Sequence, residues 1–249
     1  MKKLIIANLK MNTVPSEFKS YAMSLATKTK GTKNDIVVCV PFTHLSVAKE
    51  LLGESKVEYG VQNISDEQQG AFTGEISASM IKDLGATYTI IGHSERRRKF
   101  KETDKLVNKK IKTALANGLK VILCVGENLQ TRSSKQAYNF VKKQLDEGLK
   151  GIYENELDSV TIAYEPIWSI GTGKIPTSKD ILKMAETIRK EIEYLYSEKA
   201  GKSVKVIYGG SVNLANYKKI ISLEKVDGAL VGGACLDVEQ FVTMAREKF

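Results

Sequence analysis

The sequence predicts an α/β protein, a single-domain (β/α)8 barrel over residues 1–249. Three observations support this prediction. The chain of 249 residues is long enough for one large core, short β-rich runs alternate with longer amphipathic stretches, and eight such pairs follow one another. An open, doubly wound sheet remains the alternative, because alternation alone does not close a sheet into a barrel.

Short apolar runs rich in β-branched residues predict the strands. They are Leu4–Leu9, Ile36–Val40, Val57–Gln62, Tyr88–Gly92, Val121–Val125, Val160–Tyr164, Val204–Tyr208 and Gly228–Val231. The stretches between them carry apolar residues at helical spacing. They predict helices at Ser16–Lys28, His44–Leu52, Ala78–Leu84, Asp104–Ala116, Ser134–Gly148, Ser178–Lys199, Leu214–Ile221 and Val238–Glu247. Ser16 is an expected helix start, and Gly118 and Gly201 are expected stops.

Composition argues against several other classes of protein. No apolar run approaches the roughly 20 residues of a membrane span, and the run from Leu4 ends at Asn8, too early for a signal peptide. The odd set of Cys39, Cys124 and Cys235 contains no CxxC pair, so neither a disulfide framework nor a metal site is expected, and a reducing, cytoplasmic setting follows.

The net charge of +9 leaves a second class open, a basic barrel that binds RNA or an acidic partner. Its lysines, however, are interspersed with Glu and Asp, and no basic stripe is interleaved with aromatic residues. The sequence therefore favours a solvated, lysine-rich surface and no nucleic-acid partner.

Polar and glycine residues gather at or just after the ends of the predicted strands. They are Asn8 and Lys10, His93-Ser94-Glu95, Glu165-Pro166, Gly209-Gly210-Ser211 and Gly232-Gly233. In a parallel barrel every carboxyl end of a strand opens on the same face, so these residues should converge on one mouth.

Two of these residues suit proton transfer. Glu165 directly follows an apolar strand, so its carboxylate is expected in a partly closed pocket where desolvation can raise its pKa. This position favours a general base over a carboxylate in a strand-terminal salt bridge. His93 opens the segment Ser94–Arg98, where backbone N–H groups and a helix dipole are expected to depress its pKa and keep it neutral. His44 is expected to open a helix and has no comparable context.

Lysine and glycine at the other strand ends point to an anion. Lys10 and Asn8 can neutralise a phosphate or a developing oxyanion, although Lys10 could also face solvent or form a Schiff base. The glycine pairs at 209–210 and 232–233 leave backbone N–H groups open to a phosphate.

The connection over residues 166–177 is longer than the two to six residues that are about usual for such loops, which indicates a lid. Apolar residues at its centre can shield a site from water, and prolines stiffen both flanks. Its predicted lid residues are Pro166, Ile167, Trp168, Gly171, Gly173, Lys174 and Pro176.

At these residues the chain resembles the triosephosphate isomerase family, whose barrel is the TIM barrel. The motifs follow one another from the first strand to the last: Asn8-Leu9-Lys10-Met11-Asn12, Gly70-Ala71-Phe72-Thr73-Gly74-Glu75, Gly92-His93-Ser94-Glu95-Arg96-Arg97, Ala163-Tyr164-Glu165-Pro166-Ile167-Trp168, Gly171-Thr172-Gly173-Lys174, Tyr208-Gly209-Gly210-Ser211-Val212 and Gly232-Gly233.

The resemblance implies an isomerase of glycolysis and gluconeogenesis that interconverts dihydroxyacetone phosphate and D-glyceraldehyde 3-phosphate through a cis-enediolate, without cofactor or metal. It implies that Glu165 is the base, that His93 polarises the carbonyl, and that Lys10 and Asn8 stabilise charge. Under the same resemblance the phosphate is held by Gly171, Ser211, Gly232 and Gly233, and the site is supported by Ser94 and Glu95.

The resemblance also implies a homodimer in which residues 62–75 reach the partner, with Thr73 near the partner's Lys10 and Met11. Three positions depart from the family pattern: Leu9 stands where the family has tryptophan, Asp237 where it commonly has lysine, and Pro176 where it has an alanine. Because proline has no N–H, a closing hydrogen bond from residue 176 to Tyr208 is expected to be lost.

Overall fold

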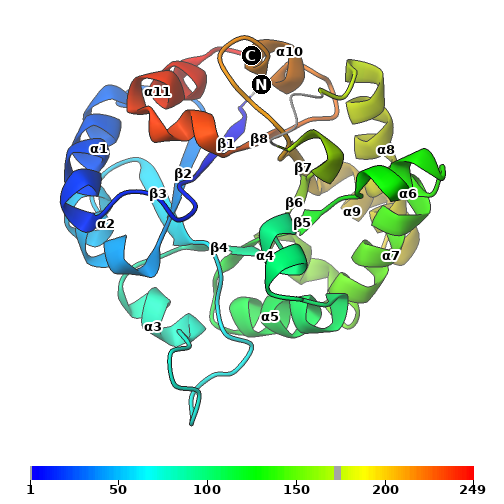
Figure 1. Cartoon of the computed structure of the whole chain (residues 1–249), viewed down its shortest axis with the longest axis horizontal. Coiled ribbons are helices and arrows are strands. Elements are labelled where there is room, and N and C mark those ends of the chain that lie inside the picture. Colours follow the sequence, from blue (N-terminus) through cyan, green and yellow to red (C-terminus); the bar gives the residue numbers. More distant parts are fainter. Residues whose placement is uncertain (1, 171–174) are drawn as a thin grey trace.

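The computed structural model describes residues 2–170 and 175–249 as a closed barrel of parallel strands with helices around it (Figure 1). The strands are β1 (Leu4–Asn8), β2 (Asp35–Val40), β3 (Val57–Val61), β4 (Tyr88–Ile91), β5 (Lys120–Val125), β6 (Val160–Tyr164), β7 (Lys205–Tyr208) and β8 (Gly228–Val231). Each pairs with the next, and β1 also pairs with β8. The predicted (β/α)8 barrel is confirmed, and the open sheet is excluded.

The helices lie outside the strands. They are α1 (Pro15–Lys28), α2 (Leu45–Leu52), α3 (Ala78–Asp83), α4 (Ser94–Lys99), α5 (Asp104–Ala116), α6 (Leu129–Ser133), α7 (Ala137–Leu149), α8 (Ser178–Leu195), α9 (Glu198–Ser203), α10 (Tyr217–Ile221) and α11 (Val238–Arg246). None of the helices in the described part of the chain is long and apolar enough to cross a membrane.

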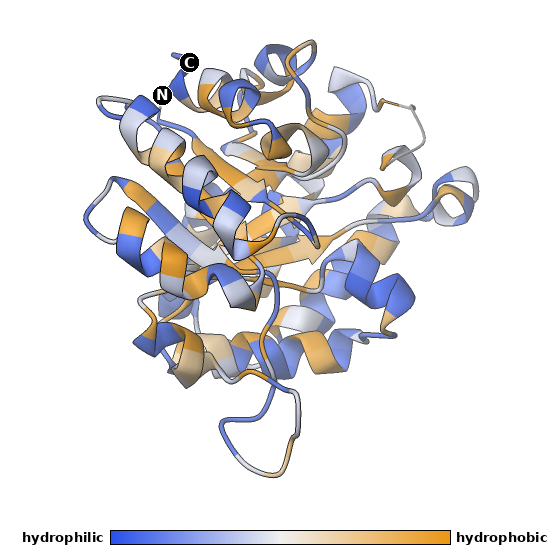
Figure 2. Ribbon diagram, turned by 60° about the vertical axis from the view of Figure 1, so that its left-hand side comes forward, coloured by the Kyte–Doolittle hydropathy of each residue, from blue (hydrophilic) through white to orange (hydrophobic). Residues whose placement is uncertain are grey.

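Alternation along each strand divides the buried side chains between two cores. One face of each strand packs against the helices, and the departure at Leu9 fits there because its side chain is 1% exposed among these residues. The other face fills the barrel with Leu4, Ile6, Val37, Cys39, Tyr88, Ile90, Ile122, Cys124, Ala163, Ile207 and Leu230. Figure 2 shows the result, with hydrophobic strands inside and hydrophilic outer faces on many helices.

Several predicted boundaries were wrong. The helix predicted over Ser178–Lys199 is two helices, because the chain breaks after α8 and Ser197 caps α9 by accepting a hydrogen bond from the N–H of Ala200. Gly201, an expected stop, lies inside α9. Gly118 does follow α5, with a left-handed φ of 67° that suits glycine.

Between β7 and β8 the backbone ladder is short, and a side chain supplements it. The register between β7 and β8 has one pair, Tyr208 with Ala229. Asp227, just before β8, adds two contacts with Val206: its N–H donates to the Val206 carbonyl at 2.8 Å, and its Oδ2 accepts from the Val206 N–H at 2.7 Å. Arg189 donates to the same Oδ2 at 2.6 Å and holds that carboxylate in place.

Candidate active site

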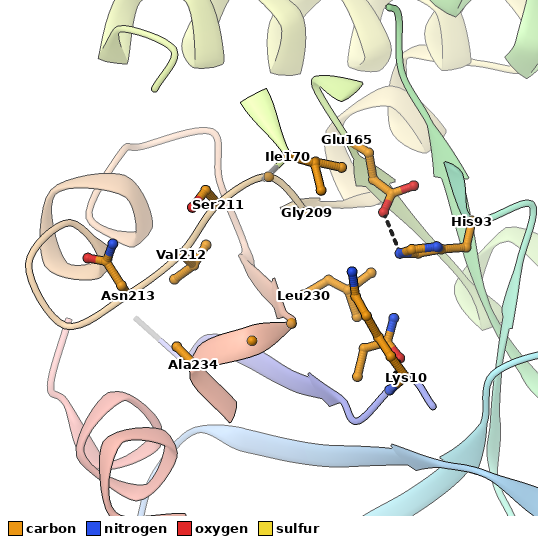
Figure 3. Close-up of a pocket in the computed structure, with 14 residues that line it drawn as sticks. Lys10, His93, Glu165, Ile170, Gly209, Ser211, Val212, Asn213, Leu230 and Ala234 are labelled. Atoms are coloured by element: carbon orange, nitrogen blue, oxygen red, sulfur yellow. Dashed lines mark hydrogen bonds and ion pairs between the residues drawn. The ribbon is translucent and has the colours of Figure 1, made fainter. Parts of the chain in front are cut away.

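A cavity of about 370 Å³ lies at the carboxyl ends of the strands (Figure 3). It is lined by Asn8, Lys10, His93, Glu165, Ile170, Gly209, Gly210, Ser211, Val212, Asn213, Leu230, Gly232, Gly233 and Ala234. The structure therefore brings together strand ends from β1, β4, β6, β7 and β8, as the barrel prediction required.

The strand alternation explains why these side chains face inward. Glu165 comes two residues after Ala163, which fills the barrel interior, and Asn8 comes two residues after Ile6, which does the same. Successive side chains of a strand point to opposite faces, so both polar groups lie on the inward face above an apolar floor.

Glu165 is buried, with 2% of its surface exposed, and both carboxylate oxygens have partners. Oε1 lies 2.9 Å from Nε2 of His93, and Oε2 accepts a hydrogen bond of 2.9 Å from the backbone N–H of Ser94. A buried carboxylate needs such partners. Ser94, a predicted supporting residue, is the first residue of helix α4, and its backbone N–H holds the Glu165 carboxylate.

His93 caps helix α4, and its two ring nitrogens have different partners. Nδ1 accepts from the backbone N–H of Glu95 at 3.2 Å, so the proton of a neutral ring lies on Nε2 and points at Glu165. Burial lowers the pKa of this imidazole, but the adjacent Glu165 carboxylate, helped by Glu95, outweighs burial and raises the pKa above its usual value. The expected depression of the His93 pKa was therefore wrong while Glu165 faces the ring.

Lys10 lies just beyond β1, which ends at Asn8, one residue before the predicted end at Leu9. Its φ of 54° is left-handed, and its N–H donates to Oδ1 of Asn8 at 3.0 Å. The ammonium reaches into the cavity and donates to Oε1 of Glu95 at 2.7 Å. Contact with Lys10 and His93 outweighs the burial of Glu95 and lowers its pKa, so Glu95 stays charged beside the lysine.

The other end of the cavity is made of small residues after β7 and β8. Ser211, Gly232 and Gly233 line it, and Figure 3 shows Ser211 on the side of the cavity away from His93 and Lys10. A side chain at Gly210 would collide with the Tyr208 hydroxyl, so only glycine fits this turn. Asp237, one of the three departures from the family pattern, caps α11, since its carboxylate accepts from the N–H groups of Glu239 and Gln240.

The described part of the predicted lid begins with a segment that is hydrogen-bonded to Glu127. The indole N–H of Trp168 donates to Oε1 of Glu127 at 2.8 Å, and the N–H of Ile167 donates to the carbonyl of the same residue at 3.0 Å. Ile170, rather than Trp168, lines the cavity. At the far flank Pro176 is buried. The predicted lid residues Gly171, Gly173 and Lys174 lie outside the described residues.

Glu127 is a site residue that the sequence analysis missed. It is fully buried and accepts from Trp168 and from the Tyr164 hydroxyl at 3.1 Å, so it joins the segment after β6 to β6 itself. Burial raises its pKa, opposed by these hydrogen bonds. Glu127 comes two residues after β5, so the strand-end rule already applied to the other strands could have found it.

No group of three His, Cys, Asp or Glu side chains within residues 2–170 and 175–249 is arranged to hold a metal ion. In the cavity a carboxylate, an imidazole and an ammonium converge at one end, and small residues line the other. This arrangement suits proton transfer on a small molecule that carries an anionic group.

Comparison with known proteins agrees with this chemistry. The family model for triosephosphate isomerase matches residues 3–248. The chain belongs to the triosephosphate isomerase family. A triosephosphate isomerase of Alkaliphilus metalliredigens is 47% identical over 243 residues, which cover 97% of this chain and 98% of that relative. One from Thermus thermophilus is 42% identical over 247 residues, covering 99% of each chain.

The family predicted from the ordered motifs is confirmed, and with it an isomerase that acts on triose phosphates. Membership favours proton transfer over the Schiff-base chemistry that the sequence analysis left open for Lys10. The geometry agrees, because Nζ of Lys10 is already engaged with Oε1 of Glu95, 2.7 Å away, whereas a Schiff base needs a free amine.

Proposed function

We propose that Glu165 carries the proton in the interconversion of dihydroxyacetone phosphate and D-glyceraldehyde 3-phosphate. The observation that carries the proposal is the direct contact between Oε1 of Glu165 and Nε2 of His93, 2.9 Å apart at the mouth of the barrel. A substrate carbonyl that accepts a hydrogen bond from Nε2 of His93 replaces Glu165 as the partner of this ring nitrogen. The Glu165 carboxylate is then free to approach the neighbouring carbon.

The reaction then proceeds as a balanced transfer of protons. Glu165 removes a proton from C1 of the ketose, and the electron pair of that C–H bond moves to give an enediolate. His93 donates its Nε2 proton to the carbonyl oxygen and takes one from the other oxygen. Glu165 returns its proton to C2, which yields the aldose and restores both side chains.

The charged intermediate explains the other polar residues. Lys10, oriented by its contact with Glu95, stabilises the developing negative charge, and Asn8 fixes the Lys10 backbone through its Oδ1. Ser211, Gly232 and Gly233 hold the phosphate, mainly through backbone N–H groups. A lid with Ile170 excludes water, because an exposed enediolate phosphate eliminates phosphate instead of being reprotonated.

The test is an isomerase assay of Glu165→Gln beside Glu193→Gln, a matched change on the exposed face of α8. Loss of a positioned base predicts a fall in kcat of at least about 100-fold for Glu165→Gln and no change for the control. Unchanged turnover in Glu165→Gln would rule out this mechanism. Borohydride trapping of substrate on Lys10 would instead support the Schiff-base alternative.

A homodimer is part of the same proposal. Residues 67–75, here called the arm, are all exposed and project from the barrel between β3 and α3 (Figures 1 and 2). A second cavity of about 490 Å³, here called the socket, is lined by polar residues together with apolar ones that include Met11, Phe42 and Phe100, of which Met11 is 96% exposed. We infer that the arm of one copy, with Thr73, fills the socket of another.

Sedimentation velocity across a dilution series tests the dimer. Thr73→Arg places a bulky charge on the arm and is expected to shift the protein to monomers with reduced turnover, while Glu54→Arg, exposed after α2, leaves both unchanged. A monomeric wild type at all concentrations would contradict the proposal. We further propose that residues 1–249 act as one domain in the cytoplasm, a setting that the free, buried thiols of Cys39, Cys124 and Cys235 support.

A further inference from the structure

The loop between β1 and α1 contains two residues with a left-handed backbone. Lys10 has a φ of 54° and Thr13 a φ of 66°. Glycine adopts this region freely, but a β-branched residue such as threonine rarely does so without a contact that holds it there. The strain at Thr13 therefore calls for an anchor.

His44 supplies that anchor. The Thr13 hydroxyl donates to the carbonyl of Asn12 at 2.6 Å, so it must accept at its second contact, which is Nε2 of His44 at 3.0 Å. At the other side of the ring Nδ1 lies 2.9 Å from the hydroxyl of Thr43, which can donate. All contacts are satisfied by one neutral tautomer, with the proton on Nε2.

The ring of His44 is a rigid support. It is 1% exposed, and it packs against the ring of Phe18 on α1 with centroids 5.2 Å apart. Burial lowers the pKa of His44, which favours the neutral ring that the two hydroxyl contacts require. A buried N–H also needs its acceptor, so His44 and Thr13 hold each other.

The anchor lies three residues from Lys10, and the intervening backbone is tied internally. The Asn12 amide donates to the Leu9 carbonyl at 2.6 Å, and the Lys10 N–H donates to Asn8 at 3.0 Å. A change at Thr13 is therefore transmitted through a short, braced turn to the backbone of Lys10.

We propose that His44 is a positioning residue, which holds the loop over residues 9–14 in the conformation that directs the Lys10 ammonium into the cavity. The inference rests on the proposed role of Lys10 and extends it to a residue on a different βα unit. His44 itself touches no substrate, since it does not line the cavity.

The first test compares two changes at the exposed position 13. Thr13→Val keeps the β-branched shape and the strain but loses the hydroxyl, so kcat/KM is expected to fall about tenfold, through a higher KM and a lower kcat. Thr13→Gly loses the same hydroxyl but removes the strain, so its kcat/KM should stay closer to wild type. Equal values for the two variants would overturn the proposal.

The second test uses a rescue at position 44. His44→Phe keeps a ring against Phe18 but has no N–H, whereas His44→Gln places an amide N–H close to the position of Nε2. The proposal predicts a loss in His44→Phe like that of Thr13→Val, recovery in His44→Gln, and little further loss when His44→Phe is added to Thr13→Gly. Melting temperatures show which variants are folded.

Full activity in His44→Phe would show that His44 acts on neither the loop nor Lys10. The same conclusion would follow if His44→Phe lowered kcat/KM as much in the Thr13→Gly background as in wild type. These outcomes are separate from a failure of the proposed function, because Glu165→Gln in the same assay reports on proton transfer. Loss in Glu165→Gln with no effect at positions 13 and 44 overturns this inference alone.

Discussion

The two rims of the barrel both gather charged side chains, but they hold them differently. At the carboxyl ends of the strands, Glu165, His93 and Lys10 contact other side chains around a cavity. At the amino ends, Arg189 donates to Asp227 and to the carbonyls of Gly201, Lys202 and Val204. The side chains around the cavity can exchange partners when a ligand binds. Arg189 and Asp227 cannot move without breaking hydrogen bonds to backbone groups.

The largest effect expected at the amino-end rim is a loss of stability without a loss of activity. Asp227→Asn removes the charge that Arg189 pairs with and is expected to lower the free energy of unfolding by about 1–3 kcal/mol. Its kcat should stay within about twofold of wild type, because one missing charge far from the mouth leaves transition-state contacts intact. Urea unfolding and an isomerase assay measure both quantities.

Glu165→Gln is the matched change at the other rim, and it should show the reverse pattern of low activity and undiminished stability. A large fall in kcat for Asp227→Asn, with unchanged unfolding, would mean that the division between the rims is wrong.

A smaller, pH-dependent effect is expected from Glu127. Burial raises the pKa of Glu127 from its usual value of 4.5, so the folded state binds this proton more tightly than the unfolded chain does. The stability that results is present below the unfolded value and is lost as the pH rises through the folded pKa.

Glu127→Gln cannot ionise, so its unfolding free energy relative to wild type should increase as the pH rises above 4.5 and then level off. Urea unfolding from about pH 4 to pH 8 tests this. Exposed Glu193→Gln is the control and should show no such trend. A relative stability that falls with pH would contradict the raised pKa.

The smallest effect concerns the lid flank at Pro176. Within the described residues the Tyr208 hydroxyl is buried and makes no hydrogen bond of good geometry. Burial raises the pKa of Tyr208 to about 12, and the nearby Ser169 hydroxyl opposes this shift. Pro176→Ala restores an N–H that could reach this hydroxyl when the lid closes, so turnover should change by about fivefold, the worth of one hydrogen bond.

Tyr208→Phe separates the causes. In the wild-type background Tyr208→Phe should change turnover little, because Pro176 has no N–H to donate to the hydroxyl. In combination with Pro176→Ala it should abolish the change in turnover that Pro176→Ala causes. Identical steady-state kinetics for wild type and Pro176→Ala would count against a lost closing bond.

Much of the fold was predictable because it depends on local patterns. The strands and the inward position of Glu165 and Asn8 follow from alternation and from the ends of apolar runs. The C-terminal end of α5 at Gly118 follows from backbone sterics. These features need only neighbouring residues, so a sequence displays them.

The features that escaped prediction depend on contacts between distant segments. The raised pKa of His93 comes from Glu165, a residue on another strand, and the role of Asp227 becomes visible only when Val206 lies beside it. The contact of Thr13 with His44 joins two βα units in the same way. Sequence spacing does not report which of these groups meet.

The account rests most directly on Glu165 as the carrier of the substrate proton. The decisive measurement follows deuterium in the product when the enzyme turns over dihydroxyacetone phosphate in heavy water. A protonated Glu165 can exchange with solvent before it returns its proton, so wild type and Asp227→Asn should both place deuterium on C2, and Glu165→Gln should lose this activity. Undiminished turnover and incorporation by Glu165→Gln would contradict the account.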